Sequence, residues 1–104
     1  MAQAQGERDA PTADSKHYTV EADTEQARVL RARYGPGEKS VMHAHPAAVA
    51  VLLTDLHCRF SYPDGTSEEL QGQAGQVLAM PATTHLPENL SDRPFEVILV
   101  ELKS

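Results

Sequence analysis

The stretch GEKSVMHAHP, residues 37–46, places a His-x-His pair just after a Gly-Pro-Gly turn and ahead of an apolar run that reaches Leu53. On an extended strand, side chains two residues apart point to the same face of a sheet. We therefore expect His43 and His45 to lie side by side. Two imidazoles are half of a metal site, but on its own the pair is equally typical of two surface or core histidines on one strand.

Short segments in which apolar and polar residues alternate recur along the rest of the chain, with Gly, Pro or Asp between them. Such alternation indicates half-buried strands, and no segment shows the sustained period of an amphipathic helix. The expected strands are residues 17–22, 28–34, 41–45, 48–54, 56–62, 67–70, 77–80, 85–90 and 95–103. This succession of strands and turns predicts an all-β sandwich or barrel.

A length of 104 residues corresponds to a single domain. Residues 1–15 are mostly small and polar and have no apolar period, so we expect a disordered or loosely attached leader there. The β-barrel domain is then expected to comprise residues 16–104.

Charge and composition exclude several kinds of partner. The formal net charge of -6 argues against a nucleic-acid partner, which needs a clustered basic patch. No apolar run approaches the roughly 20 residues of a membrane-spanning helix, so no membrane partner is expected. The single cysteine, Cys58, rules out an internal disulfide. Without a visible signal peptide we expect a cytoplasmic location, or a periplasmic or secreted one if the N-terminus is a processed or trimmed end.

A third histidine, His85, is a candidate metal ligand. His85 follows Pro81 at the start of an expected strand, just outside an apolar segment. Asn89 lies four residues further and shares the face of His85 if the strand is regular, so it is expected to orient a ligand or a bound water. Glu88 falls on the opposite face and would reach a metal only through a β-bulge.

Together these residues resemble the two sequence motifs of the cupin family. The matching positions are Gly37, His43 and His45 in the first motif, and Gly75, Pro81, His85 and Asn89 in the second. The chain is similar to small single-domain cupins of unassigned activity. The resemblance implies a jelly-roll β-barrel in which His43, His45 and His85 hold one divalent metal ion, with Fe, Zn, Ni and Mn all compatible.

The chain departs from the family pattern in two places. The motif expects a glutamate ligand at Val49 or Ala50, and both residues are apolar. It also expects a glycine where Thr83 stands, and the distance from Pro81 to His85 is one residue short. The first departure implies a site of three histidines, similar to that of cupin dioxygenases that act on thiols or β-diketones. Without a carboxylate ligand such a site keeps the full charge of the ion, which favours small anionic or chelating substrates.

Further residues are assigned to the pocket, the core or the surface. Positions behind the metal ligands or in the pocket wall are expected for Asn89, Glu88, Met80, Tyr34, Phe60 and Val49. His57 lies on the polar phase of its strand and is expected at the surface, and His17 is expected to be solvated before the first strand. Cys58 is expected to be a buried small hydrophobe. Glu101 interrupts the apolar phase of the last strand, and we expect it at a frayed end.

Two functions remain open. The first is a metal-dependent enzyme on a small substrate: a non-haem dioxygenase by analogy with three-histidine cupins, or an isomerase or lyase. The second is a non-catalytic module that binds a small molecule or a metal. In either case we expect a homodimer, because the edge strands of a small jelly roll need to be covered.

Overall fold

The computed structural model describes residues 8–103, and within them the chain forms one short helix and nine strands. Their bounds are α1 (Ala10–Ala13), β1 (Tyr18–Asp23), β2 (Ala27–Tyr34), β3 (His43–His45), β4 (Ala48–Leu52), β5 (Leu56–Ser61), β6 (Ser67–Gly72), β7 (Val77–Met80), β8 (Thr83–Asn89) and β9 (Phe95–Leu102). Each strand that the alternation predicts is confirmed, with ends that differ by at most two residues.

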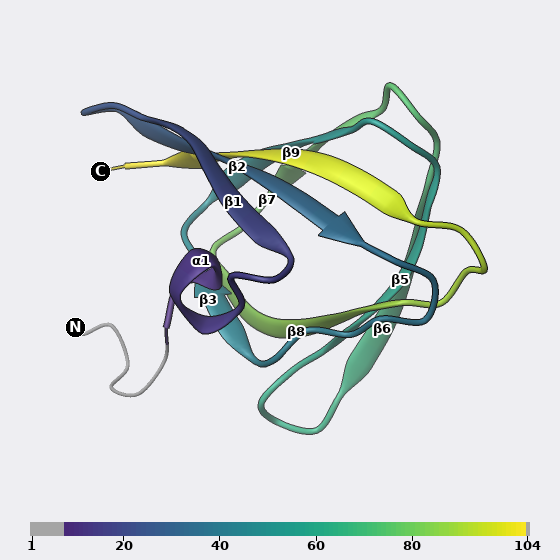
Figure 1. Ribbon diagram of the computed structural model, residues 1–104. Coiled ribbons are helices and arrows are strands. Elements are labelled where there is room, and N and C mark those ends of the chain that lie inside the picture. Colours follow the sequence, from purple (N-terminus) through teal and green to yellow (C-terminus); the bar gives the residue numbers. More distant parts are fainter. Residues whose placement is uncertain (1–7, 104) are drawn as a thin grey trace.

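The strands form two antiparallel sheets that face each other (Figure 1). One sheet has the order β1-β2-β9-β4-β7, and the other has the order β3-β8-β5-β6. Neighbours such as β2 and β9 are far apart in the sequence, which is the connectivity of a jelly roll. The prediction of a single-domain, all-β jelly-roll barrel is therefore confirmed.

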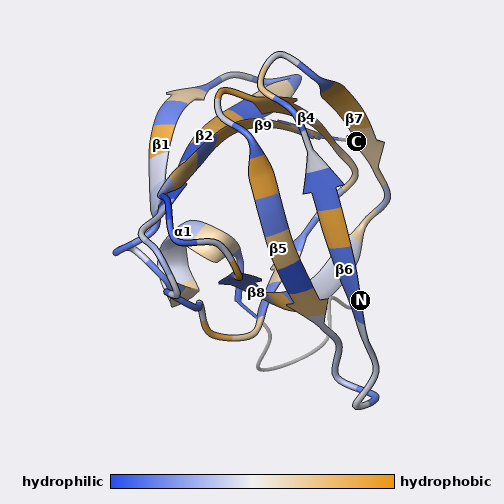
Figure 2. Ribbon diagram, turned by 90° about the vertical axis from the view of Figure 1, so that its right-hand side faces the viewer, coloured by the Kyte–Doolittle hydropathy of each residue, from blue (hydrophilic) through white to orange (hydrophobic). Residues whose placement is uncertain are grey.

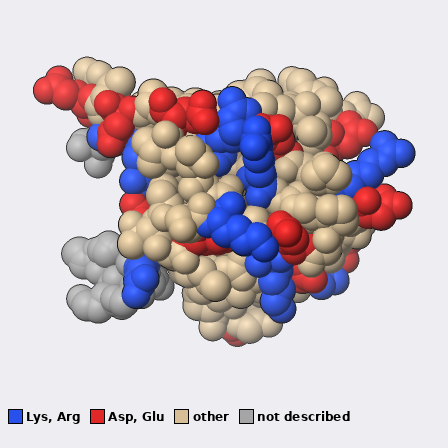
Figure 3. All heavy atoms as spheres, in the orientation of Figure 1, with Lys and Arg blue, Asp and Glu red and all other residues tan. Residues whose placement is uncertain are grey.

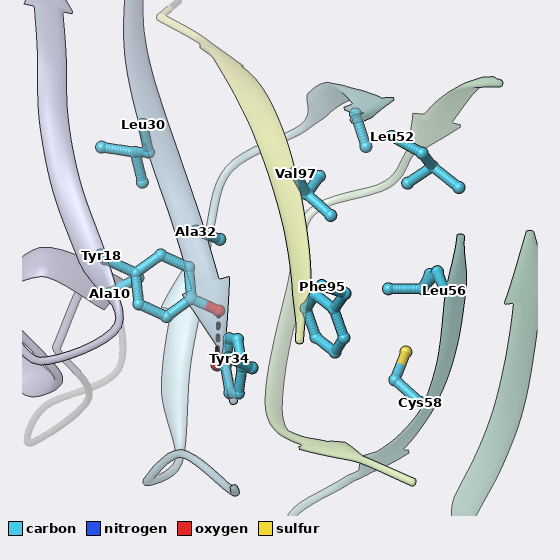
Figure 4. Close-up of a cluster of buried hydrophobic side chains, with 11 residues drawn as sticks. Ala10, Tyr18, Leu30, Ala32, Tyr34, Leu52, Leu56, Cys58, Phe95 and Val97 are labelled. Atoms are coloured by element: carbon cyan, nitrogen blue, oxygen red, sulfur yellow. Dashed lines mark hydrogen bonds between the residues drawn. The ribbon is translucent and has the colours of Figure 1, made fainter. Parts of the chain in front are cut away.

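The core lies between the two sheets because each strand turns alternate side chains inward. Figure 2 shows this alternation as apolar and polar residues that follow one another along β5. The largest side chains of the core include Tyr34, Leu30 and Leu52, each almost fully buried. Figure 4 shows the cluster, in which the hydroxyl groups of Tyr18 and Tyr34 are hydrogen bonded at 2.9 Å.

The first residues of the described chain differ from the expected loose leader. Asp9 caps α1 by accepting a hydrogen bond from the backbone N–H of Thr12 at 3.1 Å, and Pro11 stands in the first turn, where a missing N–H costs nothing. Ala10 is completely buried in the core cluster. Residues 8–15 are thus packed against the barrel, because a single buried alanine and polar side chains with specific partners anchor them without an apolar period. Residues 1–7 of the predicted leader lie outside the described residues.

Charges of both signs are interspersed on the face that Figure 3 shows. Arg31 and Arg33, which alternate along β2, both form ion pairs with Glu96 on the neighbouring strand β9. Within residues 8–103, no helix has the length and apolar character needed to span a membrane.

Candidate metal centre

The three predicted histidines converge at one end of the β3–β8 pair. A tight turn precedes β3, and Gly37 adopts a φ of 71° there, a conformation that favours glycine. His43 and His45 project to the same side of β3, and His85 on β8 is the direct partner of His43 in the antiparallel register. All three side chains are buried, and one nitrogen from each ring lies within 4.8 Å of the others.

Hydrogen bonds fix the orientation of the two histidines on β3. The Nδ1 atom of His43 lies 2.8 Å from the carbonyl oxygen of Val41, and Nδ1 of His45 lies 2.6 Å from Oε2 of Glu101. Because both partners are acceptors, each Nδ1 carries the proton and each Nε2 presents a lone pair. These two Nε2 atoms are only 3.1 Å apart. Two lone pairs at that distance repel each other unless a proton or a metal ion lies between them.

His85 leaves both of its ring nitrogens without a partner. Among the described residues, these two nitrogens are the buried side-chain polar atoms that make no hydrogen bond. Burial lowers the pKa of His85 to about 2, and burial together with the neighbouring His45 lowers the pKa of His43 to about 4. His43 and His85 are therefore neutral imidazoles, the form that binds metal ions, and an unpaired buried nitrogen is unfavourable until something binds it. The three side chains fit a divalent metal ion.

Glu101 is a buried carboxylate behind the cluster, which contradicts its expected place at a frayed strand end. Its side chain is 2% exposed. Its Oε1 atom accepts hydrogen bonds from Nη2 and Nε of Arg28 at 2.8 and 3.1 Å, and its Oε2 atom bonds to His45. Burial disfavours ionisation of Glu101, but the hydrogen bonds from His45 and Arg28 outweigh it and lower the pKa. A carboxylate hydrogen bonded to the far nitrogen of a ligand histidine fixes that ring and raises its basicity.

A second buried carboxylate stands behind His43. The Oδ2 atom of Asp14 accepts hydrogen bonds from Oγ of Ser40 at 2.5 Å and from Nδ1 of His17 at 2.6 Å. Ser40 Oγ is in turn 3.2 Å from Nδ1 of His43. His17 is buried rather than solvated: its other nitrogen bonds to Glu38, and its ring stacks on Tyr34 with 4.2 Å between the centroids.

An apolar cavity of about 70 Å³ adjoins the histidines. His45 and His85 line it, whereas its other walls come from both sheets. Those walls are Tyr18, Ala32, Tyr34, Pro46, Ala48, Ala50, Leu52, Leu56, Cys58, Phe60, Leu70, Leu78, Met80, Pro81, Thr83, Pro87, Phe95, Val97 and Leu99. No Lys, Arg, Asp or Glu is among these described lining residues, so a charged ligand group would find its counter-charge only at the histidine cluster.

The other titratable groups of this cavity stay protonated at neutral pH. Burial raises the pKa of the Cys58 thiol to about 12, which agrees with its expected role as a small buried hydrophobe. Burial also raises the pKa of both Tyr18 and Tyr34, and their hydroxyl groups bond to each other. Among these three residues, none offers a base that takes up a proton near pH 7.

Asn89 does not orient a ligand as the sequence predicted, and Glu88 lies outside the pocket, on the strand face that the alternation predicted for it. Asn89 is buried, but its Nδ2 donates to the backbone carbonyls of Tyr34, Gly35 and Arg93 at 3.2, 3.0 and 2.8 Å, and its Oδ1 accepts from Ser91. Asn89 therefore joins two turns and has no free atom for a ligand. Glu88 points away from the cluster, as strand alternation requires, and pairs with Arg59 at 3.5 Å.

Of the remaining predicted pocket residues, three line the cavity and one does not. Tyr34, Phe60 and Met80 line the cavity as predicted, and the ring of Phe60 packs on His85 with 4.2 Å between the centroids. Val49 is not a pocket residue, because β4 turns its neighbours Ala48 and Ala50 inward. The expected surface position of His57 agrees with its half-exposed side chain, which pairs with Glu69.

Sequence reasoning missed Glu101, Arg28, Asp14 and Ser40 as parts of this centre. One signal for Glu101 was available: it shares the inward phase of β9 with Phe95, Val97 and Leu99, and a carboxylate on a buried phase needs a partner. The other three residues carry no comparable signal, because their roles depend on which strands become neighbours.

Solved structures with the same fold include several small cupins. A cupin domain from Bordetella pertussis Tohama I is 29% identical over 84% of this chain and 92% of its own, with a TM-score of 0.77. A double-stranded β-helix protein from Klebsiella pneumoniae is 19% identical over 98% of this chain and 82% of its own, with a TM-score of 0.65. A chain from the crystal structures of the DMSP lyases RdDddP and RnDddQII is 20% identical over 78% of this chain and 40% of its own, with a TM-score of 0.55.

No protein-family model matches the sequence, and no curated protein sequence matches it. The likeness to the Bordetella protein extends over most of both chains, and it agrees with the two-sheet topology. The chain has the double-stranded β-helix fold of small cupin domains, to which it is similar, with a buried cluster of three histidines that can hold a metal ion.

Proposed function

We propose that this cupin binds one divalent metal ion through His43, His45 and His85 and acts as an enzyme on a small chelating or anionic substrate. The observation that carries the proposal is the arrangement of the lone pairs. Two Nε2 atoms face each other at 3.1 Å, and both nitrogens of the third imidazole lack any partner. Such a set of buried neutral donors is stabilised when one cation binds all three.

The shape and lining of the cavity suit a substrate with one anionic or chelating end and one apolar end. Its walls are apolar apart from the histidines, Thr83, Cys58 and the paired tyrosine hydroxyl groups, and its volume is about 70 Å³. A chelating or anionic group would lie at His45 and His85, and a compact apolar body would lie between the sheets. The ion, rather than a basic side chain, would neutralise the anionic group.

The residues around the cavity favour a dioxygenase-like reaction over one that needs a side-chain base. Cys58, Tyr18 and Tyr34 all have raised pKa values, so they stay protonated and take no proton from a substrate near pH 7. A bound divalent ion supplies Lewis acidity and, if it is iron, a route to dioxygen chemistry. The likeness to a chain from DMSP lyase structures, at 20% identity, concerns the fold alone and does not distinguish a lyase from a dioxygenase.

Elemental analysis of the full-length protein, purified without added metal, tests the metal site. We expect near-stoichiometric metal in the wild type and its loss in His85→Ala, while His57→Ala, a matched change of a half-exposed histidine, keeps the metal. Absence of metal from the wild type, together with no uptake of Fe, Zn, Ni or Mn on dialysis, would refute the proposal. Oxygen consumption by the Fe(II) form with a panel of thiols and β-diketones then tests the enzyme.

The alternative function is a non-catalytic module that binds a small molecule or a metal. The same observation on Cys58 and the two tyrosines supports it, because side chains that stay protonated supply no base for turnover but still leave an apolar pocket that can bind a ligand. Thermal shifts with ligands, combined with no oxygen uptake and no product across the panel, would favour this reading over the enzyme.

We also propose that the protein forms a homodimer. The edge strand β7 leaves Val77 60% exposed and has a neighbour on one side only, and such edges tend to pair with another chain. Analytical ultracentrifugation tests this, and a monomer mass at micromolar concentration would contradict it.

A further inference from the structure

The strand that carries two of the three histidines is short and lies at a sheet edge. β3 has three residues and a single strand neighbour, β8. Its open edge is covered by the first described residues: the N–H of Ala44 donates to the carbonyl oxygen of Arg8 at 2.8 Å, and Asp9 forms a parallel bridge with Ala44. Ala44 stands between His43 and His45, so this backbone contact lies between the two ligands.

One chain of side-chain hydrogen bonds runs from this segment to His45. Oδ2 of Asp9 accepts from Nη1 of Arg28 at 2.9 Å. Arg28 donates through Nε and Nη2 to Glu101, and Glu101 accepts from Nδ1 of His45 at 2.6 Å. The other oxygen of Asp9 caps α1, so the helix holds the carboxylate in place. Each link has a charged partner, which makes these hydrogen bonds short and directional.

A second chain runs from the same segment to His43. Asp14, at the C-terminal end of α1, accepts from Ser40 at 2.5 Å, and Ser40 Oγ is 3.2 Å from Nδ1 of His43. His17 holds the same Asp14 oxygen from the other side at 2.6 Å. With its proton donated to Asp14, the Ser40 hydroxyl oxygen accepts from the His43 ring, which supports the same tautomer as the bond to Val41.

Attachment of the N-terminal segment to the barrel explains only part of this arrangement. An ion pair such as Asp9 with Arg28, each partly exposed, contributes little to stability by itself. Both chains end instead on the Nδ1 atom of a histidine, the atom whose partner determines where the opposite lone pair points. Figure 1 shows α1 beside β3, which places the origin of both chains next to the strand they act on.

We propose that residues 8–17 form a strap that positions His43 and His45 for metal binding through the chains Asp9–Arg28–Glu101–His45 and Asp14–Ser40–His43. The inference rests on the proposed metal site and adds that metal affinity depends on residues at the start of the chain. Glu101, Asp9 and Asp14 are positioning residues in this scheme, since each acts through another side chain.

Cobalt binding to the metal-free, full-length protein tests the strap. Affinity is measured by competition with a chelator, and the visible absorption band of bound Co(II) reports the geometry of the ligands. Outer-shell partners of metal-ligating histidines typically contribute about 10–100-fold in affinity. We therefore expect Glu101→Gln to weaken binding by about that factor, with a shifted absorption band, and Asp14→Asn and Asp9→Asn to weaken it by smaller factors.

The matched controls are Glu88→Gln, on the outward face of β8, and the exposed Asp92→Asn, both of which should bind cobalt like the wild type. If Glu101→Gln fails to fold, Asp9→Asn carries the test, because Asp9 lies at the partly exposed end of the same chain. Restoration of affinity in Asp14→Glu, relative to Asp14→Asn, would support the role of the carboxylate.

The outcomes separate the two proposals. A wild type that binds no cobalt and no other divalent ion overturns the proposed function and the strap with it. A wild type that binds cobalt, with unchanged affinity and spectrum in Glu101→Gln, Asp14→Asn and Asp9→Asn, overturns the strap alone.

Discussion

β3 and β8 hold the histidines of the cluster in different ways. On β3, His43 and His45 each have Nδ1 in a hydrogen bond, with a backbone carbonyl and a buried carboxylate as partners. On β8, His85 makes no side-chain hydrogen bond and packs against Phe60. Hydrogen bonds of the fold therefore determine the orientation of His43 and His45, whereas His85 is held by packing and keeps unpaired nitrogens.

The comparison predicts that the metal-free protein loses stability as the pH falls from 6.5 to 4.5. Burial holds the pKa of His43 at about 4 and that of His85 at about 2, but both titrate at about 6.5 in the unfolded chain. In this window the unfolded chain binds protons that the folded protein does not, so a lower pH favours unfolding. The two residues together should cost about 4 kcal/mol over the two pH units.

Urea denaturation at a series of pH values, in the presence of a chelator, measures this dependence. The variant His85→Leu should show roughly half of the loss. A stability that stays constant between pH 6.5 and 4.5 would contradict the buried, neutral state of these histidines.

For β3, where the histidines are hydrogen bonded, we predict that His45→Leu destabilises the metal-free protein by about 2 kcal/mol. Leucine removes the hydrogen bond to Glu101, whose side chain is 2% exposed, and leaves that buried charge with Arg28 alone. Chemical denaturation checks the value. The control His57→Leu changes a half-exposed histidine and should alter stability by less than about 0.5 kcal/mol.

For His85 on β8, which makes no side-chain hydrogen bond, the comparison predicts a substitution that raises the free energy of unfolding, with the smallest effect of the series. His85→Leu should stabilise the metal-free protein by about 1 kcal/mol, because it replaces two unsatisfied buried nitrogens with apolar atoms beside Phe60. The same denaturation series measures this. A loss of stability equal to that of His45→Leu would show that the two strands do not differ in this respect.

Most of the fold could be predicted from the sequence, because strand alternation and turn residues are local. The three histidines could also be placed, since two lie at strand spacing and the third follows a proline at a strand start. Glu101 was misplaced because its partners come from strands far away in the sequence. Asn89 was misplaced for a related reason: its face on β8 was right, but the turn carbonyls that it binds belong to distant residues.

The chain of contacts from Asp9 through Arg28 and Glu101 to His45 also has a consequence for how related sequences can diverge. Loss of Glu101 alone leaves Arg28 without its buried partner and His45 without its acceptor, so a tolerated replacement requires compensating changes at several of these positions. Substitutions at positions 9, 28, 45 and 101 should consequently be correlated among homologues, although the first and the last are far apart in the sequence.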